Sequence, residues 1–340
     1  MIRILKNKVQ LWEQGDDWKA HVARCARVCY ASNKQDGNEQ MIQRLYDQDH
    51  LSMFRHRSMY WALPVDSIKW SALYAMAKNN PYMRIKREGQ EGLGDIIFIS
   101  TNGHFWLDHQ QELELMGITE ENQCSAELMA SGPGKEIMRY TFWLRTQVST
   151  SRELNRVSPN NIAEQSTRFC NYTKEGFNGA PAICTPWWFD LHEPNGLGED
   201  DEILFGHDGC REEFSFSNGN GMLSSLPWDD MKKAYAYRFM DEQGPRVAEQ
   251  ILRCYLNSLS FGGSAYQALV GQYRMKPQDA RGVLNLDLCT EVVYTYFYDE
   301  WERLFENRCE GKRGVPHPNA RMVMEKVQNI IEDIYNNGEG

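Results

Sequence analysis

The chain has 340 residues, of which 41% are hydrophobic and 12% aromatic, and this composition excludes an intrinsically disordered protein. The length is enough for one large domain or two ordinary ones. The formal net charge is −10, from 47 acidic and 37 basic residues. We therefore expect neither a nucleic-acid partner nor a membrane partner, because binding to either draws on an excess of Lys and Arg.

The nine cysteines form no CxxC pair, so the sequence indicates no zinc ribbon, no thioredoxin-type site and no metal centre. The first residues carry charges where a signal peptide needs an apolar segment. The longest uncharged run, residues 254–273, contains Asn, Ser, Gln and Gly and is too polar to span a bilayer. We expect a soluble protein of a reducing compartment, the cytoplasm.

The first part of the chain predicts strands and helices, followed by an irregular region. In chain order we expect an edge strand over 1–12, a helix over 16–30, a helix over 37–48 and a strand over 58–65. Asp16 or Asp17 is the expected N-cap of the first helix. Residues 66–135 contain NNPY, STNG and SGPG turns, and we expect them to elaborate the domain with less regular structure.

The rest of the chain predicts mostly helices. In order we expect a helix over 136–156, long excursions with little regular structure over 173–228, helices over 229–260, a helix beginning at Pro277, a long helix over 287–308 and a last helix over 318–336. No internal repeat is visible. The segments together predict an α+β fold in a single domain, 1–340, with insertions at about 66–135 and 173–250.

Arginines are concentrated in one part of this acidic chain. Residues 139–172 contain five Arg and two Glu, a local surplus of +3 (5 − 2). In the predicted helix 136–156, the spacing of Arg145, Arg152 and Arg156 places them on one face. Arginine binds phosphate with its planar fork of donors. The pattern indicates a small-anion site, and a solvated helix face with Arg–Glu pairs is the alternative.

A second candidate site residue, Arg308, lies at the end of an apolar stripe in another predicted helix. In the predicted helix 287–308 the stripe has helical spacing and consists of Val293, Phe297, Trp301 and Leu304. Arg308 lies one turn further on, where a guanidinium needs an anionic or carbonyl partner. Arg281 is a second candidate for the same pocket. A structural ion pair is the alternative for each.

Several familiar motifs are missing. SGPGKE at 131–136 lacks the leading Gly and the Ser/Thr of a P-loop, and GNGMLS at 219–224 does not fit the dinucleotide fingerprint. No HExxH and no GxSxG occurs. The sequence therefore does not indicate an ordinary kinase, a Rossmann dehydrogenase, a zinc protease or an α/β-hydrolase.

Five segments, in this order, resemble the flavin-dependent thymidylate synthases. They are ARVCYAS (26–32), HLSMFRH (50–56), SRELNRVSPNNIAEQSTRFCNY (151–172), ARGVLNLDLCTEVVYT (280–295) and LFENRC with PHPNA (304–309 and 316–320). The resemblance covers about a third of the chain. It implies the family's fold, in which mixed helices surround a twisted, largely antiparallel sheet.

The resemblance also implies site residues. Those that would bind the nucleotide are Glu153, Arg156, Glu164, Ser166, Arg168, Arg281 and Arg308, with Arg308 as the catalytic group that polarises the uracil ring. Those that would bind the flavin are Cys29, His56, Arg156, Ser158 and Glu164. A lone His beside aromatics, as at position 56, is otherwise more often structural.

Some positions depart from the family's pattern. Val157 and Ser158 stand in place of the His and the second Arg of its R-H-R signature, which removes flavin contacts. Phe297 and Asp299 stand where many members have Asn and Arg for the flavin. These replacements are expected to change how a flavin would be placed, and with it the reaction that the chain catalyses.

The function implied by the resemblance is transfer of a one-carbon unit from methylenetetrahydrofolate to C5 of dUMP, giving dTMP. FAD would carry the hydride, NADPH would reduce the FAD, and a homotetramer would share its sites between subunits. One alternative is a pyrimidine-nucleotide hydroxymethyltransferase on the same framework. Another is a non-catalytic nucleotide-binding paralogue. The choice between a uracil and a cytosine base stays open.

Overall fold

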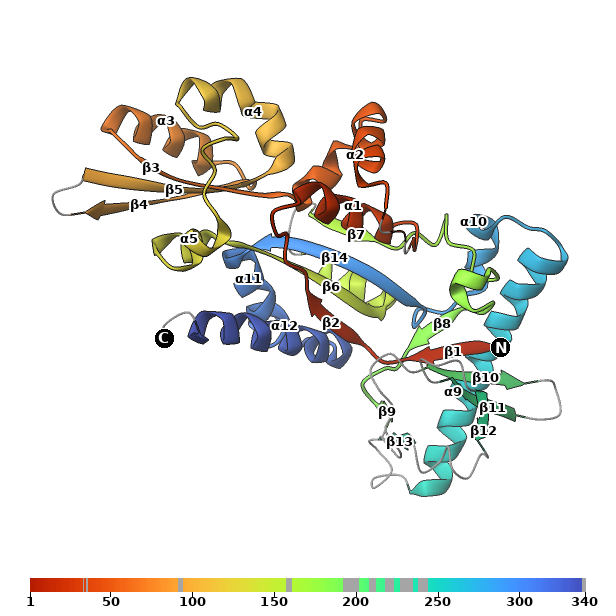
Figure 1. The fold of residues 1–340 in the computed structure, drawn as a ribbon. Coiled ribbons are helices and arrows are strands. Elements are labelled where there is room, and N and C mark those ends of the chain that lie inside the picture. The colour runs from red at the N-terminus through yellow and green to blue at the C-terminus, as the bar shows by residue number, and fades with distance from the viewer. Residues whose placement is uncertain are drawn as a thin grey trace.

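The structure is a computed structural model with an α+β fold whose sheets are largely antiparallel, as expected from the sequence (Figure 1). The described residues are 1–32, 34, 36–90, 94–156, 161–191, 202–207, 212–217, 223–226, 235–237 and 244–337. A central sheet with helices on both faces carries a lobe with its own sheet at one end. A third sheet, which contains the N-terminal strand, lies at the other end.

The central sheet has four antiparallel strands in the order β2-β6-β14-β7. Their bounds are β2 (Lys8–Leu11), β6 (Arg139–Gln147), β14 (Cys289–Phe297) and β7 (Ile162–Glu164). β6 and β14 pair along their whole length, from Arg139 opposite Phe297 to Gln147 opposite Cys289. The two longest strands thus form the centre of the sheet, and the short β7 is one edge.

These strands correct two helix predictions. Residues 136–156 and 287–308 each contain a strand, β6 and β14, that is followed by a helix, α6 (Val148–Leu154) and α11 (Tyr298–Arg308). All nine residues of β6 are buried, so the strand has no exposed face and no alternating pattern. Arg145 therefore lies on a strand and shares no helix face with Arg152 and Arg156.

Helices cover both faces of the central sheet (Figure 1). α1 (Trp18–Val28) packs through Cys25 and Val28 against Trp143 and Val293. The alternate residues of the strands, such as Leu144, point to the other face, where they meet α6, α11 and α12 (Pro318–Asn337). The helices predicted over 16–30 and 318–336 are confirmed, and Asp17 caps the first by accepting from the backbone of Ala20 at 2.9 Å.

The lobe corrects the prediction of irregular structure at 66–135. It contains the sheet β3-β5-β4, helices that cover it and a short connection to β6. In chain order these are β3 (Ser58–Pro64), α3 (Ser67–Lys78), β4 (Met83–Gln90), β5 (Gly94–Asn102), α4 (Gly103–Leu115), α5 (Ala126–Ala130) and η2 (Pro133–Ile137). Trp61 and Trp106 stack in its core with ring centroids 5.5 Å apart. The lobe therefore has a hydrophobic cluster of its own.

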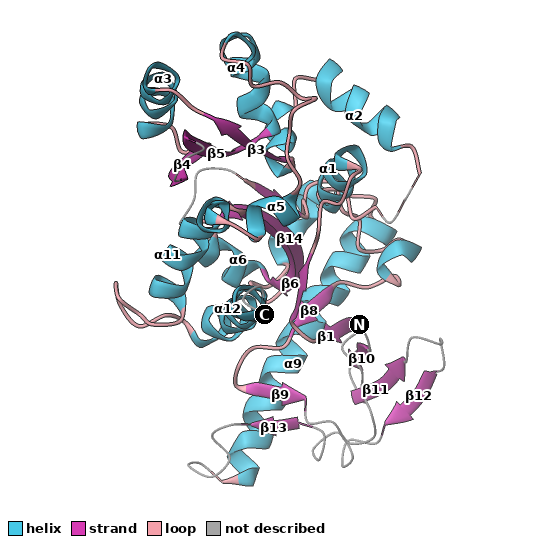
Figure 2. Cartoon of the chain, turned by 60° about the vertical axis from the view of Figure 1, so that its left-hand side comes forward, coloured by secondary structure: helices cyan, strands magenta, loops and turns pink. Residues whose placement is uncertain are grey.

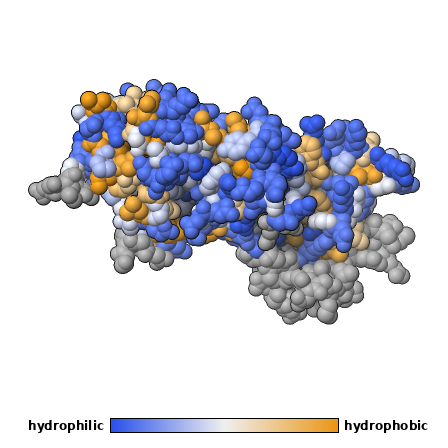
Figure 3. Space-filling model, turned by 45° about the horizontal axis from the view of Figure 1, so that its top comes forward, coloured by the Kyte–Doolittle hydropathy of each residue, from blue (hydrophilic) through white to orange (hydrophobic). Residues whose placement is uncertain are grey.

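The surface of the molecule is mostly hydrophilic on the face drawn in Figure 3, with hydrophobic side chains gathered at the end that holds the lobe. Ile68 on α3 and Leu115 on α4 are 82% and 89% exposed. α3 is apolar on its outer side as well as its inner side, and the central body leaves that outer side uncovered.

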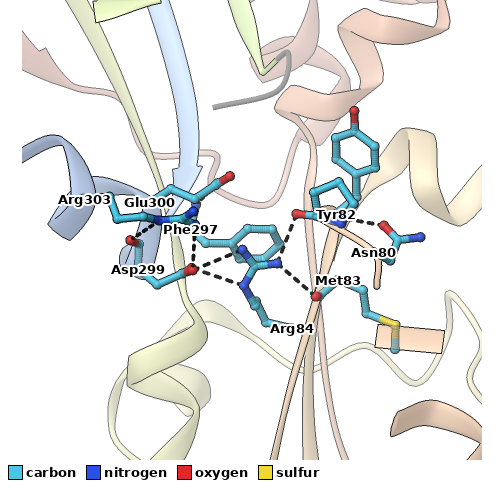
Figure 4. Close-up of polar contacts among 9 residues, drawn as sticks. Asn80, Tyr82, Met83, Arg84, Phe297, Asp299, Glu300 and Arg303 are labelled. Atoms are coloured by element: carbon cyan, nitrogen blue, oxygen red, sulfur yellow. Dashed lines mark hydrogen bonds and ion pairs between the residues drawn. The ribbon is translucent and has the colours of Figure 1, made fainter. Parts of the chain in front are cut away.

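The lobe is fastened to the central body through Arg84 of β4 (Figure 4). Its guanidinium donates to both carboxylate oxygens of Asp299 at 3.2 and 3.1 Å, and it lies 4.5 Å from the ring centroid of Phe297. Asp299 also accepts from Arg303 at 3.1 Å. Phe297 and Asp299, which depart from the family's pattern in sequence, thus serve the packing of the lobe.

The third sheet corrects the prediction for 173–228, which contains strands. The sheet β12-β11-β10-β1-β8 and the pair β13-β9 lie beside α9, as Figure 2 shows. The bounds are β1 (Ile2–Leu5), β8 (Ala182–Cys184), β9 (Phe189–Leu191), β10 (Glu202–His207), β11 (Glu212–Ser217), β12 (Leu223–Leu226), β13 (Tyr235–Tyr237) and α9 (Pro245–Gln267). The strand predicted over 1–12 is two strands in two sheets. Of the helices predicted over 229–260, α9 is confirmed from Pro245, residues 235–237 form the strand β13, and 229–234 and 238–243 lie outside the described residues.

The remaining elements are short, apart from α2, which confirms the second predicted helix. They are α2 (Asn38–Asp47), η1 (Leu51–His56), η3 (Glu175–Phe177), η4 (Ala268–Gln272), α10 (Pro277–Ala280) and η5 (Arg281–Val283). Pro277 starts α10 as predicted. Searched over the described residues, the structure has no helix with the length and apolar character needed to cross a membrane.

Candidate functional site

Glu164, at the end of the edge strand β7, is held by neutral donors. One carboxylate oxygen accepts from the hydroxyls of Ser151 and Thr290 at 2.6 and 3.2 Å, and the other accepts from the amide of Asn155 at 3.2 Å. The hydroxyl of Tyr294 donates to Asn155 at 2.7 Å. The carboxylate is therefore fixed in orientation, and its capacity to accept further hydrogen bonds is largely used.

Ser166 begins the turn that follows β7. Its backbone N–H donates to the carbonyl of Cys29 at 3.0 Å, which ties the turn to the end of α1. Its hydroxyl accepts from the backbone N–H of Arg168 at 3.3 Å. This short turn places the hydroxyl of Ser166 and the side chain of Arg168 in one small region.

Arg281 reaches the same turn from a distant part of the chain. Its guanidinium donates to the hydroxyl of Thr167 at 2.8 Å, and Arg168 donates to the amide oxygen of Gln278 at 3.3 Å. Within the described ranges, neither guanidinium forms an ion pair with a carboxylate. Two exposed cations that bind only neutral oxygens are suited to an anion such as a phosphate.

Arg308 lies in a second group, at the end of α11. Its guanidinium donates to the backbone carbonyl of Glu153 at 2.8 Å, and its Nε lies 3.9 Å from a carboxylate oxygen of the same residue. The Arg308 side chain is 18% exposed, and its buried Nε–H has no hydrogen-bond acceptor. The guanidinium is thus held near the surface with one donor left over.

The two groups approach β7 from opposite faces of the central sheet. Ser166 is tied to the end of α1, whereas Arg308 is tied to α6. Arg156 is exposed just beyond α6. Ser158 lies outside the described residues. The structure therefore brings together Arg168 with Arg281, and Arg308 with Glu153, as two separate groups within one copy of the chain.

His56 lies in the interior, away from both groups. Its Nδ1 is 2.8 Å from the hydroxyl of Thr295, which is 2.8 Å from the hydroxyl of Thr141, and Thr141 is 3.4 Å from Nε2 of His21. Burial lowers the pKa of His56 to about 3, with His21 and Arg139 adding to the effect. Burial likewise lowers the pKa of His21 to about 4. Both imidazoles are neutral at physiological pH.

These histidines predict that the free energy of unfolding falls as the pH drops below about 6.5, their ordinary pKa. The unfolded chain takes up protons in this range and the folded chain does not, so the stability is full above pH 6.5 and is lost toward pH 4. At pH 5 each histidine should cost roughly 2 kcal/mol. Urea unfolding at pH 7 and pH 5 measures the loss.

The variants His21→Gln and His56→Gln provide the control for this pH dependence. The two histidines together contribute a slope of the unfolding free energy against pH. Each variant should remove about half of that slope, even if the variant is less stable at pH 7. An unchanged slope in the double variant would show that other groups, such as carboxylates, cause the acid sensitivity.

Comparison with known proteins places this chain in a family. The model of the family described as Thy1, thymidylate synthase complementing protein, matches residues 108–335. The chain belongs to this family. The Thy1 match covers both groups around β7 together with β6, α6, β14 and α11, but not α1 or β2. None of the curated proteins compared with the chain matches it.

The chain is also similar to crystal structures of a UMP/dUMP methylase, PolB, from Streptomyces cacaoi. The structure bound with 5-Br dUMP has a TM-score of 0.39 and 13% identity, covering 99% of this chain and 96% of that chain. The structure bound with 5-Br UMP has the same TM-score and identity, covering 99% of this chain and 95% of that chain.

The Thy1 family is flavin-dependent in general. A flavin would need free polar groups on the residues predicted to bind it. His56 is fully buried, and Glu164 already accepts three hydrogen bonds. The carbonyl of Cys29 accepts from Ser166. Of the described candidates only Arg156 presents an open polar group. Within one copy of the chain these residues do not fit a flavin.

Sequence reasoning missed residues that support the Thy1 site. Asn155 and Tyr294 orient Glu164 from two different elements. Arg139 holds η1 and β3 against the central sheet through backbone carbonyls. Asn155 and Tyr294 lie inside the 151–172 and 280–295 segments that resemble the family, which was the available signal for both. For Arg139 the sequence contained no such signal.

Proposed function

We propose that this Thy1 chain binds dUMP and transfers a one-carbon unit from methylenetetrahydrofolate to C5 of the pyrimidine. The observation that carries the proposal is the family match, because residues 108–335 include all seven residues predicted for the nucleotide. The arginine groups around β7 add the chemistry that a nucleotide monophosphate requires. Cytosine in place of uracil would need a different set of donors and acceptors at the ring edge.

The phosphate is assigned to Arg168 and Arg281. Both guanidiniums are exposed and make only neutral hydrogen bonds, so a phosphate would gain charge-assisted bonds without breaking an ion pair. The hydroxyl of Ser166 lies in the same turn and would add a further donor. This arrangement fixes one end of the substrate.

The uracil ring is assigned to Arg308. Its guanidinium, anchored on the carbonyl of Glu153, would donate to the N3–C2=O edge, where negative charge develops as C5 becomes nucleophilic. Arg308 and Arg281 approach β7, the edge strand of the central sheet, from opposite faces. A single nucleotide that contacts both arginines must therefore either bend around this edge strand or bind between two copies of the chain. We favour the second arrangement, a homotetramer with shared sites, in which Glu153 and Arg156 line the Arg308 side.

The product depends on how the carbon unit is completed. Formation of dTMP requires a hydride, for which FAD reduced by NADPH is the family's general source. Formation of the 5-hydroxymethyl nucleotide requires only water. The poor fit of Cys29, His56 and Glu164 to a flavin favours the hydroxymethyltransferase as a second candidate. A nucleotide-binding paralogue without activity would form neither product.

Mass spectrometry of the product tests these candidates. The purified protein is incubated with dUMP and methylenetetrahydrofolate labelled at the transferred carbon, with and without FAD and NADPH. Labelled dTMP that requires both cofactors supports the methyl transfer, and labelled 5-hydroxymethyl nucleotide formed without them supports the second candidate. Binding of dUMP with no product identifies a paralogue, and absence of both product and dUMP binding refutes the proposal.

The variant Arg281→Gln should weaken dUMP binding by about 10- to 100-fold, because a charge-assisted hydrogen bond contributes about 1.5–3 kcal/mol. Isothermal titration calorimetry measures the change in Kd. Arg313→Gln, which removes an exposed arginine outside both groups, is the matched control and should bind dUMP normally. Equal affinity in the two variants would remove Arg281 from the phosphate site.

A further inference from the structure

Two neighbouring glycines, Gly262 and Gly263, lie inside α9 and are buried. Glycine inside a helix is less stable than alanine, because its backbone loses more conformational freedom on folding. α9 packs against both η5 and β1, and each glycine lies at one of these two contacts. The pair therefore indicates that other parts of the chain approach this helix too closely for a side chain.

Gly262 lies at the contact with η5. A Cβ atom at this position would lie 2.7 Å from the backbone carbonyl oxygen of Val283, the last residue of η5. An ordinary contact begins at 3.4 Å, so the two atoms would have to separate by about 0.7 Å (3.4 − 2.7). Because the obstacle is backbone, rotation of a side chain cannot relieve it. A side chain at position 262 therefore displaces η5 from α9.

η5 carries Arg281, which is the first residue of this single turn. The carbonyl of Arg281 accepts from the N–H of Leu284 at 3.1 Å, and only Gly282 separates Arg281 from Val283. A shift of the turn therefore moves the backbone of the arginine with it. The guanidinium donates to the hydroxyl of Thr167 at 2.8 Å, and a hydrogen bond of this length is weakened by a shift of that size.

The same face of α9 also supports the chain that follows β7. Tyr266 lies one helical turn after Gly262 and is fully buried. Its ring centroid lies 5.6 Å from that of Tyr172. Both tyrosines belong to one hydrophobic cluster with Ala280, the residue before Arg281. One helix face thus lies behind both parts of the chain that supply the exposed arginines of the proposed phosphate site.

Gly263 contacts a different neighbour. A Cβ atom at this position would lie 2.6 Å from Cγ2 of Ile2 and 2.9 Å from the carbonyl oxygen of Met1. The crowding is comparable to that at Gly262, but it involves β1, which carries none of the predicted site residues. Gly263 therefore offers a matched control for Gly262 in the same helix.

We propose that Gly262 is a positioning residue for Arg281. Because Gly262 has no side chain, η5 packs directly on α9, and this contact sets how far the guanidinium reaches toward the phosphate. The inference rests on the proposed function, in which that phosphate belongs to dUMP. Gly262 acts only through Arg281, so it affects binding of the phosphate and not the chemistry at the pyrimidine ring.

The variant Gly262→Ala should weaken dUMP binding by about tenfold or more, because a binding site tolerates a displacement of only about 0.5 Å. Isothermal titration calorimetry measures the change in Kd. KM for dUMP should rise with Kd, whereas kcat at saturating dUMP should stay near that of the wild-type chain. Wild-type affinity in Gly262→Ala would overturn the inference.

Gly263→Ala is the control for a general loss of packing around α9. It should lower the urea midpoint of unfolding about as much as Gly262→Ala does, and it should bind dUMP with wild-type affinity. An equal loss of affinity in the two variants would mean that any disturbance of α9 weakens the site, and would refute the specific role of Gly262.

A double variant shows whether Gly262 acts through Arg281. Gly262→Ala combined with Arg281→Gln should bind dUMP no more weakly than Arg281→Gln alone. Losses that multiply would contradict the inference, since Gly262 would then support the site through another contact. If Gly262→Ala does not fold, Leu284→Ala takes its place, because it loosens η5 from the same hydrophobic cluster without crowding α9. Normal dUMP binding by Leu284→Ala would then count against the inference.

Hydrogen exchange tests the geometry without dUMP. The amides of residues 281–288 should exchange faster in Gly262→Ala than in the wild-type chain, and those of residues 2–5 should exchange faster in Gly263→Ala. Unchanged exchange at 281–288 would disprove the role of Gly262 even if dUMP binds. A wild-type chain that does not bind dUMP would refute the proposed function, and the exchange result would then decide by itself whether Gly262 positions Arg281.

Discussion

Replacing Arg308 with Ala should lower kcat by about 10²- to 10³-fold, because one preorganised donor to developing negative charge contributes on that scale. The guanidinium of Arg308 is anchored on the carbonyl of Glu153 at 2.8 Å, which fixes its orientation. Single-turnover kinetics with dUMP and methylenetetrahydrofolate would separate this effect on the chemical step from an effect on binding.

Two variants control the Arg308 experiment. Arg303→Ala removes a guanidinium from the same helix, but Arg303 is half exposed and pairs with Asp299, so its rate should stay near wild type. Arg308→Lys keeps the charge and loses the planar fork, and should remain at least about tenfold slow. A near-normal rate for Arg308→Ala would assign ring activation to another group.

The fold could be predicted from the sequence where the signal is local. The cap of α1 at Asp17 and the helix α12 depend on residues a few positions apart, and both were expected. The strands β6 and β14 were not, because each is buried on both faces and shows no alternation. Their composition, rich in Thr, Val, Tyr and Phe, was the signal for strands, and it was outweighed by the lack of Gly and Pro.

For the candidate site, too, some features could be predicted from the sequence and others depend on how the chain packs. The sequence interpretation placed Arg168, Arg281 and Arg308 in one nucleotide site. The structure brings Arg168 and Arg281 to one turn although 113 residues (281 − 168) separate them, but it does not bring Arg281 beside Arg308 within one copy of the chain. Order alone could not show that Arg308 approaches β7 from the other face, since this depends on how α11 packs. Nor could it show that Glu164 is saturated by Ser151, Asn155 and Thr290.

A second large effect is expected at Arg139, a buried guanidinium at the start of β6. It donates to the carbonyls of Arg57 and Arg55 at 2.9 and 2.5 Å and to the hydroxyl of Ser58 at 3.1 Å. These acceptors lie where η1 passes into β3, so one side chain fastens the lobe's first strand to the central sheet. Burial lowers its pKa to about 10, and it remains charged at neutral pH.

Arg139→Met should lower the free energy of unfolding by about 3–5 kcal/mol, measured by urea denaturation at neutral pH. Two terms oppose each other. Removing the charge relieves its desolvation, but it takes a buried donor away from the hydroxyl of Ser58, at roughly 1–3 kcal/mol, and it also removes the donor to the carbonyl of Arg55. The carbonyl of Arg57 keeps a second donor, the N–H of Gly103. We expect the lost hydrogen bonds and the lost tie between lobe and sheet to dominate.

Arg84→Met is the matched comparison, because it also removes a guanidinium between the lobe and the central body. Arg84 pairs with Asp299, a carboxylate that is 43% exposed, so this variant should lose about 1 kcal/mol or less. A loss of similar size in the two variants would mean that burial adds nothing to the role of Arg139. A gain in stability for Arg139→Met would mean that desolvation of the guanidinium outweighs every hydrogen bond it makes.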